Sequence, residues 1–219
     1  MIQTRIETLP RVVGAPPGKP VREGVADGQA RARRLALEPG TWDRDEAAGM
    51  AARFDQAAPD WESDRGGYRR PPLADALARG GPSGRAPLGW AVEIASGTGL
   101  MTPLIQSVWP RVAALDLSPG MLARAKTGAR IRADASRLPL IGGRAAAVVI
   151  CDGPLFAAEV VRVLAPGAPL VWSNALGRGA PFYLPTETLA AALADASGQP
   201  WRVVQSEAHW GSWAVLRPA

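Results

Sequence analysis

From Trp90 onward, short apolar runs alternate along the chain with segments of helical character. The apolar runs have the length of strands and show little apolar-polar alternation, which is typical of strands that are buried on both faces. This order predicts parallel strands joined by right-handed helical crossovers, with helices on both faces of one sheet. The strands are predicted at 91–95, 112–117, 129–133, 146–151 and 169–173. The helices between them are predicted at 100–109, 119–126 and 155–164.

The last residues of the chain follow another pattern. The stretch "WRVVQSEAHWGSWAVLRPA" holds two strand-like runs, separated by a turn near Gly211 and Ser212. Two such runs around a short turn predict an antiparallel hairpin, which we place at the edge of the sheet. The single histidine, His209, lies in this hairpin among tryptophans, where we expect aromatic packing rather than catalysis.

The segment before residue 86 differs in composition. Its first part is rich in proline and glycine and predicts an extended arm with one short helix over 27–37. Residues 43–57 begin with acidic side chains and carry apolar ones four apart, which predicts a capped amphipathic helix. A second helix is predicted at 72–80, followed by a glycine-rich linker. The predicted organisation is an arm (1–40), a helical cap or lid (41–85) and a core (86–219).

Composition excludes several classes of protein. A chain of 219 residues with 47% hydrophobic content can bury the core of one full domain. No apolar run approaches the ~20 residues that span a bilayer. The N-terminus lacks the layout of a signal peptide, so we expect a cytoplasmic protein without membrane contact. A single cysteine, Cys151, allows no internal disulfide, and with one histidine a Cys/His zinc site is excluded, so we expect no metal.

The charge of the chain does not favour a nucleic-acid partner. The net charge is +5, but arginines and acidic residues are interleaved along the sequence and only two lysines occur. The one basic cluster, Arg31, Arg33 and Arg34, is interpreted as a solvated helix face. We expect a small-molecule substrate and a monomer or homodimer.

Two glycines stand at the turn from the first core strand to the first core helix. In the stretch "AVEIASGTGLM", Gly97 and Gly99 would let the backbone approach a ligand at the carboxyl end of the sheet. A dinucleotide fingerprint requires a third glycine where this chain has Thr102. No lysine lies near, so a P-loop is also excluded.

The stretch "VEIASGTG" resembles the first motif of the class I S-adenosylmethionine-dependent methyltransferases. Further stretches resemble the later motifs of that family in order: "AALDLSPGMLARA", "IRADASRLPL", "AAAVVICDGPLF" and "EVVRVLAPGAPLVWS". The resemblance covers residues 54–219. It implies a Rossmann-like α/β fold, with a mostly parallel seven-stranded sheet, an antiparallel C-terminal hairpin and an N-terminal helical cap. It also implies S-adenosyl-L-methionine as cofactor. Where the family usually has a glycine this chain has Ala95, for which we expect right-handed backbone angles and slightly less room for the cofactor.

The resemblance implies a role for three carboxylates. Asp116 would accept hydrogen bonds from both ribose hydroxyls, with a capping role at the following helix as the alternative. Asp134 would accept from the adenine amino group beside the Ala135 amide, with a turn carboxylate as the alternative. Glu93 would hold the glycine loop from beneath.

Further residues are predicted at the same site. Trp61, in "FDQAAPDWE", would cover the cofactor or else pack with Phe54 in the core of the cap. Cys151 is expected to be a small buried residue without reactive role. The remaining predicted cofactor contacts are Ser96, Leu117 and Met121.

The acceptor is not specified by these motifs. Methyl transfer from a sulfonium is an in-line displacement that mainly needs alignment. Asp152 is the predicted catalytic residue through contact with the acceptor, and Asn174 is predicted to contact the substrate. Besides a small-molecule methyltransferase, an RNA or protein methyltransferase and a non-catalytic module that binds the cofactor remain open.

Overall fold

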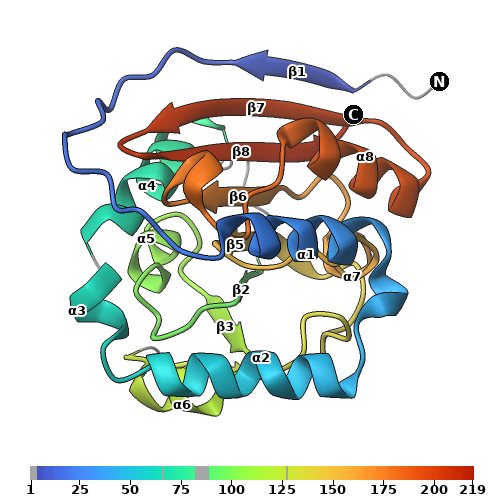
Figure 1. Cartoon of the computed structure of the whole chain (residues 1–219). Helices are drawn as coiled ribbons and strands as arrows, with labels where there is room; N and C mark the ends of the chain where they lie inside the picture. Colours follow the sequence, from blue (N-terminus) through green and yellow to red (C-terminus); the bar gives the residue numbers. More distant parts are fainter. Residues whose placement is uncertain (1–3, 66, 82–88, 127) are drawn as a thin grey trace.

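An eight-stranded sheet runs through the molecule in the order β1-β7-β8-β6-β5-β2-β3-β4 (Figure 1). The structure is a computed structural model that describes residues 4–65, 67–81, 89–126 and 128–219. The strands are β1 (Arg5–Thr8), β2 (Trp90–Ile94), β3 (Val112–Asp116), β4 (Arg130–Arg132), β5 (Ala145–Cys151), β6 (Leu170–Asn174), β7 (Trp201–Ala208) and β8 (Gly211–Pro218). Only β8 is antiparallel to its neighbours, so the predicted α/β fold with a C-terminal hairpin is confirmed.

Helices cover both faces of the sheet. The α-helices are α1 (Val25–Leu37), α2 (Arg44–Ala57), α3 (Trp61–Arg65), α4 (Arg70–Arg79), α5 (Thr102–Gln106), α6 (Pro119–Arg124), α7 (Ala157–Val163) and α8 (Thr186–Ser197). The described residues also form single turns of 3-10 helix at η1 (Pro39–Thr41), η2 (Gly67–Arg69) and η3 (Gly177–Gly179). One apolar core lies between the sheet and α1, α7 and α8, and a second lies between the sheet and α4 and α5.

The predicted core elements are present with shifted ends. The strands begin or end within one or two residues of their predicted bounds, whereas the helix predicted at 100–109 is regular only over α5. The capped helix predicted at 43–57 is α2, and the Asp43 carboxylate accepts from the amides of Asp45 and Glu46 at 2.9 Å. Most of the predicted linker, residues 82–88, lies outside the described residues.

The hairpin of β7 and β8 does not form the sheet edge that we predicted. Its turn is at His209 and Trp210, one or two residues earlier than predicted. β1 pairs with β7 in parallel, so the sheet has eight strands rather than seven. Unpaired backbone groups on an edge strand favour a partner, and the proline-rich arm supplies one. The bridge from Val13 to Ala208 extends the pairing toward the turn.

A buried carboxylate joins α4 to β8. Asp75 is 7% exposed and accepts from Arg79 Nε at 2.7 Å, from Arg79 Nη2 at 2.6 Å and from Trp213 Nε1 at 2.7 Å. The Arg79 hydrogen bonds hold the pKa of Asp75 below its ordinary value. The buried indole N–H of Trp213 therefore depends on Asp75 for its partner, whereas Arg79 also donates to the Pro10 carbonyl at 3.1 Å and to Ser206 Oγ at 3.3 Å.

We expect Asp75→Asn to lower the free energy of unfolding by about 1 to 3 kcal/mol, because the amide cannot accept from both partners. Urea unfolding at neutral pH measures the difference. Since the folded pKa of Asp75 is lowered, its contribution is present above the ordinary aspartate pKa and lost as the pH falls through the folded value. The variant and the wild type should therefore converge in acid.

The matched control is Glu62→Gln, which removes an exposed ion pair with Lys126 at 3.7 Å. It should change the free energy of unfolding by less than about 0.5 kcal/mol. Equal effects of the two substitutions would show that Asp75 does not join α4 to β8 as described.

Candidate functional site

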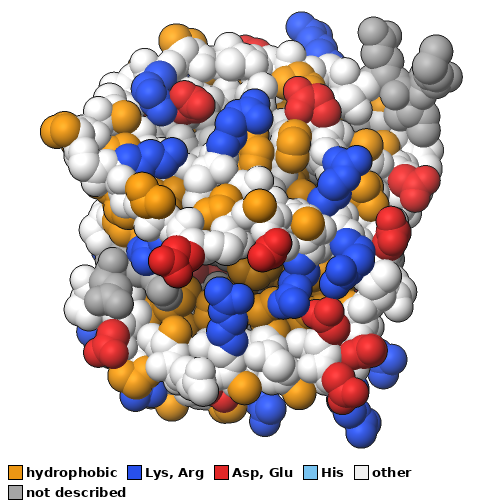
Figure 2. Space-filling view, viewed as in Figure 1, with side chains coloured by type: hydrophobic (Ala, Val, Ile, Leu, Met, Phe, Trp, Pro, Cys, Tyr) orange, Lys and Arg blue, Asp and Glu red, His pale blue; other side chains and the backbone are white. Residues whose placement is uncertain are grey.

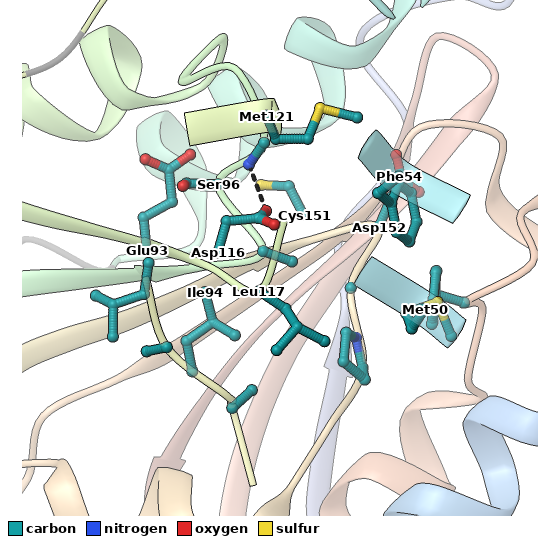
Figure 3. A pocket seen from close by; sticks show the side chains of 18 of the residues that line it. Met50, Phe54, Glu93, Ile94, Ser96, Asp116, Leu117, Met121, Cys151 and Asp152 are labelled. Atoms are coloured by element: carbon teal, nitrogen blue, oxygen red, sulfur yellow. Dashed lines mark hydrogen bonds between the residues drawn. The ribbon is translucent and has the colours of Figure 1, made fainter. Parts of the chain in front are cut away.

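A pocket opens at the carboxyl ends of β2, β3 and β5, the edge where an open parallel sheet presents its loops. Figure 3 shows Met50 and Phe54 of α2 on one side of it and the residues that follow β2 and β3 on the other. The predicted site residues that line the pocket are Trp61, Glu93, Ala95, Ser96, Gly97, Asp116, Leu117, Met121, Asp134, Ala135, Cys151 and Asp152. Gly99 and Asn174 are not among the lining residues.

The loop between β2 and α5 is held by backbone bonds and by left-handed residues. Gly97 and Gly99 have φ angles of 56° and 78°, which explains the choice of glycine at both. The Gly99 amide donates to the Ser96 carbonyl at 2.9 Å, and the Ser96 amide to the Leu115 carbonyl at 3.0 Å. A Cβ on Gly97 would lie 3.7 Å from Trp61 Nε1, so the indole passes directly over the loop.

Ala95 does not keep the right-handed angles that we expected. Its φ is 57°, a conformation that costs a residue with a Cβ about 1 to 2 kcal/mol. A Cβ on Gly153 would lie 2.8 Å from the Ala95 Cβ. Because Gly153, after β5, has no side chain, the methyl group of Ala95 fits beside it.

Asp116 connects the glycine loop to the next loop of the sheet. Its Oδ2 accepts from the Gly97 amide at 2.7 Å and its Oδ1 from the Ser118 amide at 2.8 Å. Burial raises the pKa of Asp116, and these backbone donors oppose the rise. The cap of α6 is Ser118, whose Oγ accepts from the Met121 amide at 3.0 Å. Ser118, rather than Asp116, therefore caps α6.

Asp134 has a partner that sequence reasoning missed. Both of its carboxylate oxygens lie within 3.1 Å of Trp42 Nε1, and Oδ1 also accepts from the Ser136 amide at 2.8 Å. The Trp42 ring meets Phe156 edge to face, with centroids 5.6 Å apart. Trp42 directly precedes the cap of α2, and nothing in the sequence pattern relates it to a loop 92 residues later.

Glu93 is buried and Cys151 is half-buried at the base of the pocket. Thr102 Oγ1 donates to Glu93 Oε2 at 2.5 Å, which ties β2 to the start of α5. Burial raises the pKa of Glu93 to about 8, so this side chain is mostly protonated at neutral pH. Burial also raises the pKa of the Cys151 thiol, and Ser173 Oγ lies 3.2 Å from its sulfur. The unreactive role expected for Cys151 stays a prediction.

Asp152 is held by several partners. Its Oδ2 lies 3.4 Å from Arg69 Nη1, and its Oδ1 accepts from the Ala175 amide at 3.1 Å and from Asn174 Nδ2 at 3.4 Å. Asn174 thus reaches the pocket only through Asp152. Contact of Asp152 or Asn174 with an acceptor stays a prediction.

Side chains from the N-terminal part of the chain form what we call the roof of the pocket. The roof consists of Leu35, Trp42, Met50, Phe54 and Trp61. The Phe54 and Trp61 rings meet edge to face at 5.6 Å, as the packing alternative predicted, and cover of the cofactor by Trp61 stays a prediction. Asp55 fixes α2 to α6, because its Oδ1 accepts from the Gly120 amide at 2.8 Å and from Ser118 Oγ. These donors lower the pKa of Asp55.

His209 lies apart from this pocket. Its ring packs against Trp210 with centroids 4.3 Å apart, in the turn between β7 and β8. This packing agrees with the aromatic role expected for it. Within the described residues, no cluster of His, Cys, Asp and Glu side chains could hold a metal ion.

Comparison with known proteins yields a family model and structural neighbours. Residues 92–172 match the model of a methyltransferase domain. No protein of curated function matches the chain. The structure resembles a chain in the complex between the Haloferax volcanii Trm112 methyltransferase activator and a methyltransferase, at 16% identity and TM-score 0.59, covering 75% of this chain and 97% of that one.

Two further neighbours have the same fold. One is a methyltransferase from Thermotoga maritima, described as a possible histamine N-methyltransferase, at 19% identity and TM-score 0.56, covering 76% of this chain and 98% of that one. Another is a Haemonchus contortus phosphoethanolamine N-methyltransferase in complex with S-adenosyl-L-methionine, at 17% identity and TM-score 0.52, covering 68% of this chain and 43% of that one.

We expect Asp116→Ala to weaken binding of S-adenosylhomocysteine by about 1.5 to 3 kcal/mol for each charged hydrogen bond to the ribose that is lost. Asp116→Asn should recover part of this, because an amide oxygen is a weaker acceptor. Calorimetric titration measures both. Ser118→Ala is the comparison: it should lower the free energy of unfolding by about 0.5 to 2 kcal/mol and leave affinity nearly unchanged. Wild-type affinity in Asp116→Ala would refute the ribose role.

Proposed function

We propose that the chain is a class I S-adenosylmethionine-dependent methyltransferase whose methyl acceptor is a small molecule, on the premise that residues 92–172 match a methyltransferase domain. The observation that carries the proposal is the roof over the pocket. Arm and cap residues enclose the carboxyl edge of β2, β3 and β5 with apolar side chains. An enclosed pocket of this kind admits a small ligand more readily than a folded macromolecule.

The residues of the pocket fit the cofactor. Asp116 accepts from two backbone amides, and Asp134 accepts from one backbone amide and from the Trp42 indole. A carboxylate has about four acceptor sites, so each keeps capacity for a ribose hydroxyl or an amino group. Ser96 Oγ is buried without a hydrogen-bond partner among the described residues. When bound, the cofactor supplies an electrophilic methyl group on a sulfonium. Gly97 would let the backbone approach it, and Trp61, which lies over the loop, would exclude water.

This chain's own contribution to the reaction is alignment. Positioning of two reactants can lower a barrier by up to about 7 to 11 kcal/mol, so no covalent intermediate is required. The roof and the glycine loop would hold the donor, while the acceptor approaches in line with the bond that breaks. Asp152 forms an ion pair with Arg69, and we assign it no proton transfer in this reaction.

The charges of the surface do not favour a nucleic-acid substrate. Arg34 lies 3.2 Å and Arg31 3.8 Å from carboxylate oxygens of Glu46, so two members of the basic cluster link α1 to α2. Arg33 Nη1 lies 3.5 Å from Thr188 Oγ1. In Figure 2, lysine and arginine side chains are interleaved with aspartate and glutamate over the visible face. An RNA or protein methyltransferase would need basic residues gathered around the pocket.

We expect S-adenosylmethionine and S-adenosylhomocysteine, but neither NAD nor ATP, to raise the melting temperature of the purified protein. A ligand that binds only the folded state stabilises it by about 2.7 kcal/mol at a hundredfold excess over Kd. NAD and ATP serve as controls because the loop lacks the third glycine and the phosphate-binding lysine. A rise in melting temperature with NAD and none with S-adenosylmethionine would overturn the cofactor assignment.

We expect any binding of RNA to be nonspecific and to fall steeply as salt is raised, because dispersed arginines contribute only phosphate contacts. The measurement is transfer of labelled methyl groups from the cofactor to bulk RNA and to a panel of small hydroxyl, amino and thiol compounds. Methylation of RNA that persists at moderate salt would contradict the small-molecule proposal. Cofactor binding without transfer to any acceptor would favour the non-catalytic alternative.

A further inference from the structure

A second cavity lies beside the segment that follows β6. Its volume is about 370 Å³, and residues of β1 and the arm after it, of the hairpin of β7 and β8, and of η3 and the loop that leads to α8 line it. Phe182 in this segment lines the pocket under the roof, whereas its neighbour Tyr183 lines the second cavity. Among the described residues, none lines both cavities. The second cavity is large enough for a small ligand, since ligand sites occupy roughly 300 to 1,000 Å³.

The second cavity has an apolar base and a charged rim. Its buried lining residues are Trp172, Leu184, Ser206, Trp213 and Ala214. All of these except the serine are apolar. The charged lining residues, Arg11, Arg178 and Glu207, are exposed. Two guanidinium groups and one carboxylate give the rim a net positive charge. The cavity therefore suits a ligand with an apolar body and a negatively charged end.

The two arginines of the rim differ in their partners. Arg11 Nη2 lies 3.0 Å from a carboxylate oxygen of Glu207 and donates to the His209 carbonyl at 3.2 Å. Arg178 forms no ion pair within the described part of the chain, and its Cζ lies 5.5 Å from the centroid of the Tyr183 ring, within the range of a cation–π contact. Such a contact leaves the edge of the guanidinium for an anion, and its planar fork of N–H donors matches a carboxylate.

Tyr183 adds a second donor at the same place. Burial raises the pKa of Tyr183 above its ordinary value, with Arg178 opposing the rise and Glu187 and Glu207 adding to it. The phenol is therefore protonated at neutral pH and can donate a hydrogen bond to an anion. Its ring also offers an apolar surface to an aromatic ligand.

We propose that the second cavity is a further small-molecule site, which binds an aromatic carboxylate with its ring against the apolar base and its carboxylate on Arg178 and Tyr183. One guanidinium without a counter-ion balances one negative charge, which favours a carboxylate over a phosphate monoester, whose charge at neutral pH is about −1.5 to −2. The proposal goes beyond the proposed function, because this site is separate from the pocket under the roof and its ligand binds without the cofactor.

The experiment compares three probes by fluorine NMR titration of the purified chain. The probe 4-fluorobenzoate has a ring and a carboxylate, 4-fluorobenzamide keeps the ring without the charge, and trifluoroacetate keeps the charge without the ring. The wild type should bind 4-fluorobenzoate at least about tenfold more tightly than either of the others, because only this probe uses both the base and the rim.

Substitutions at the rim test the two donors separately. Arg178→Gln should weaken binding of 4-fluorobenzoate by about 10- to 100-fold, the effect of one charge-assisted hydrogen bond, and leave 4-fluorobenzamide nearly unchanged. Tyr183→Phe keeps the ring and removes the hydroxyl, so it should weaken 4-fluorobenzoate by about threefold to tenfold. The matched control is Arg202→Gln, at an exposed arginine of β7 that lines neither cavity, and it should leave all affinities unchanged.

Saturation with S-adenosylhomocysteine should leave the affinity for 4-fluorobenzoate nearly unchanged. Displacement of the probe would place it in the pocket under the roof and overturn the proposal. Absence of probe binding to the wild type, or equal losses in Arg178→Gln and Arg202→Gln, would overturn it as well. Failure of S-adenosylhomocysteine itself to bind contradicts the proposed function and leaves the comparison of the three probes valid. Equal melting temperatures show that the variants are folded.

Discussion

The carboxylate of Asp116 is the contact around which the site is organised. By accepting from the amides of Gly97 and Ser118, it joins the loop after β2 to the loop after β3. Both loops stand at the carboxyl edge because β2 and β3 are parallel neighbours. Residues of the two loops then line one space, which side chains of α2 and α3 cover. The pocket thus follows from parallel pairing together with one buried acidic side chain.

The roof depends on contacts between the N-terminal part and the sheet. Asp55 binds the start of α6, Trp42 binds Asp134, and Arg34 joins α1 to α2 through Glu46. Each of these bonds ends on a loop or helix next to the pocket. The arm also completes the sheet as β1, so one segment supplies an edge strand and leads into the helix that carries Leu35 of the roof. Arm, cap and core consequently share one site.

Two features of the site that the sequence analysis missed have the same physical origin. Ala95 takes a left-handed conformation because the turn requires it. The absence of a side chain at Gly153 leaves room for the methyl group of Ala95. The Asp152 carboxylate forms an ion pair with Arg69, which lies in a 3-10 turn 83 residues earlier in the chain. In both cases the partner is distant in sequence. A motif shows which residue types stand near one another along the chain, and it does not show what packs against them.

The sequence by itself determined the alternation of strands and helices, the glycine turn after β2 and the carboxylates that end up beside it. Periodicity and turn chemistry act over a few residues, so they can be read from the chain directly. Only the tertiary structure decided that the arm pairs with β7, that Trp42 meets Asp134 and that Arg69 stands in the pocket. Those contacts depend on which layers of the fold come together, because a side chain's partner across a layer is set by packing rather than by its neighbours along the chain.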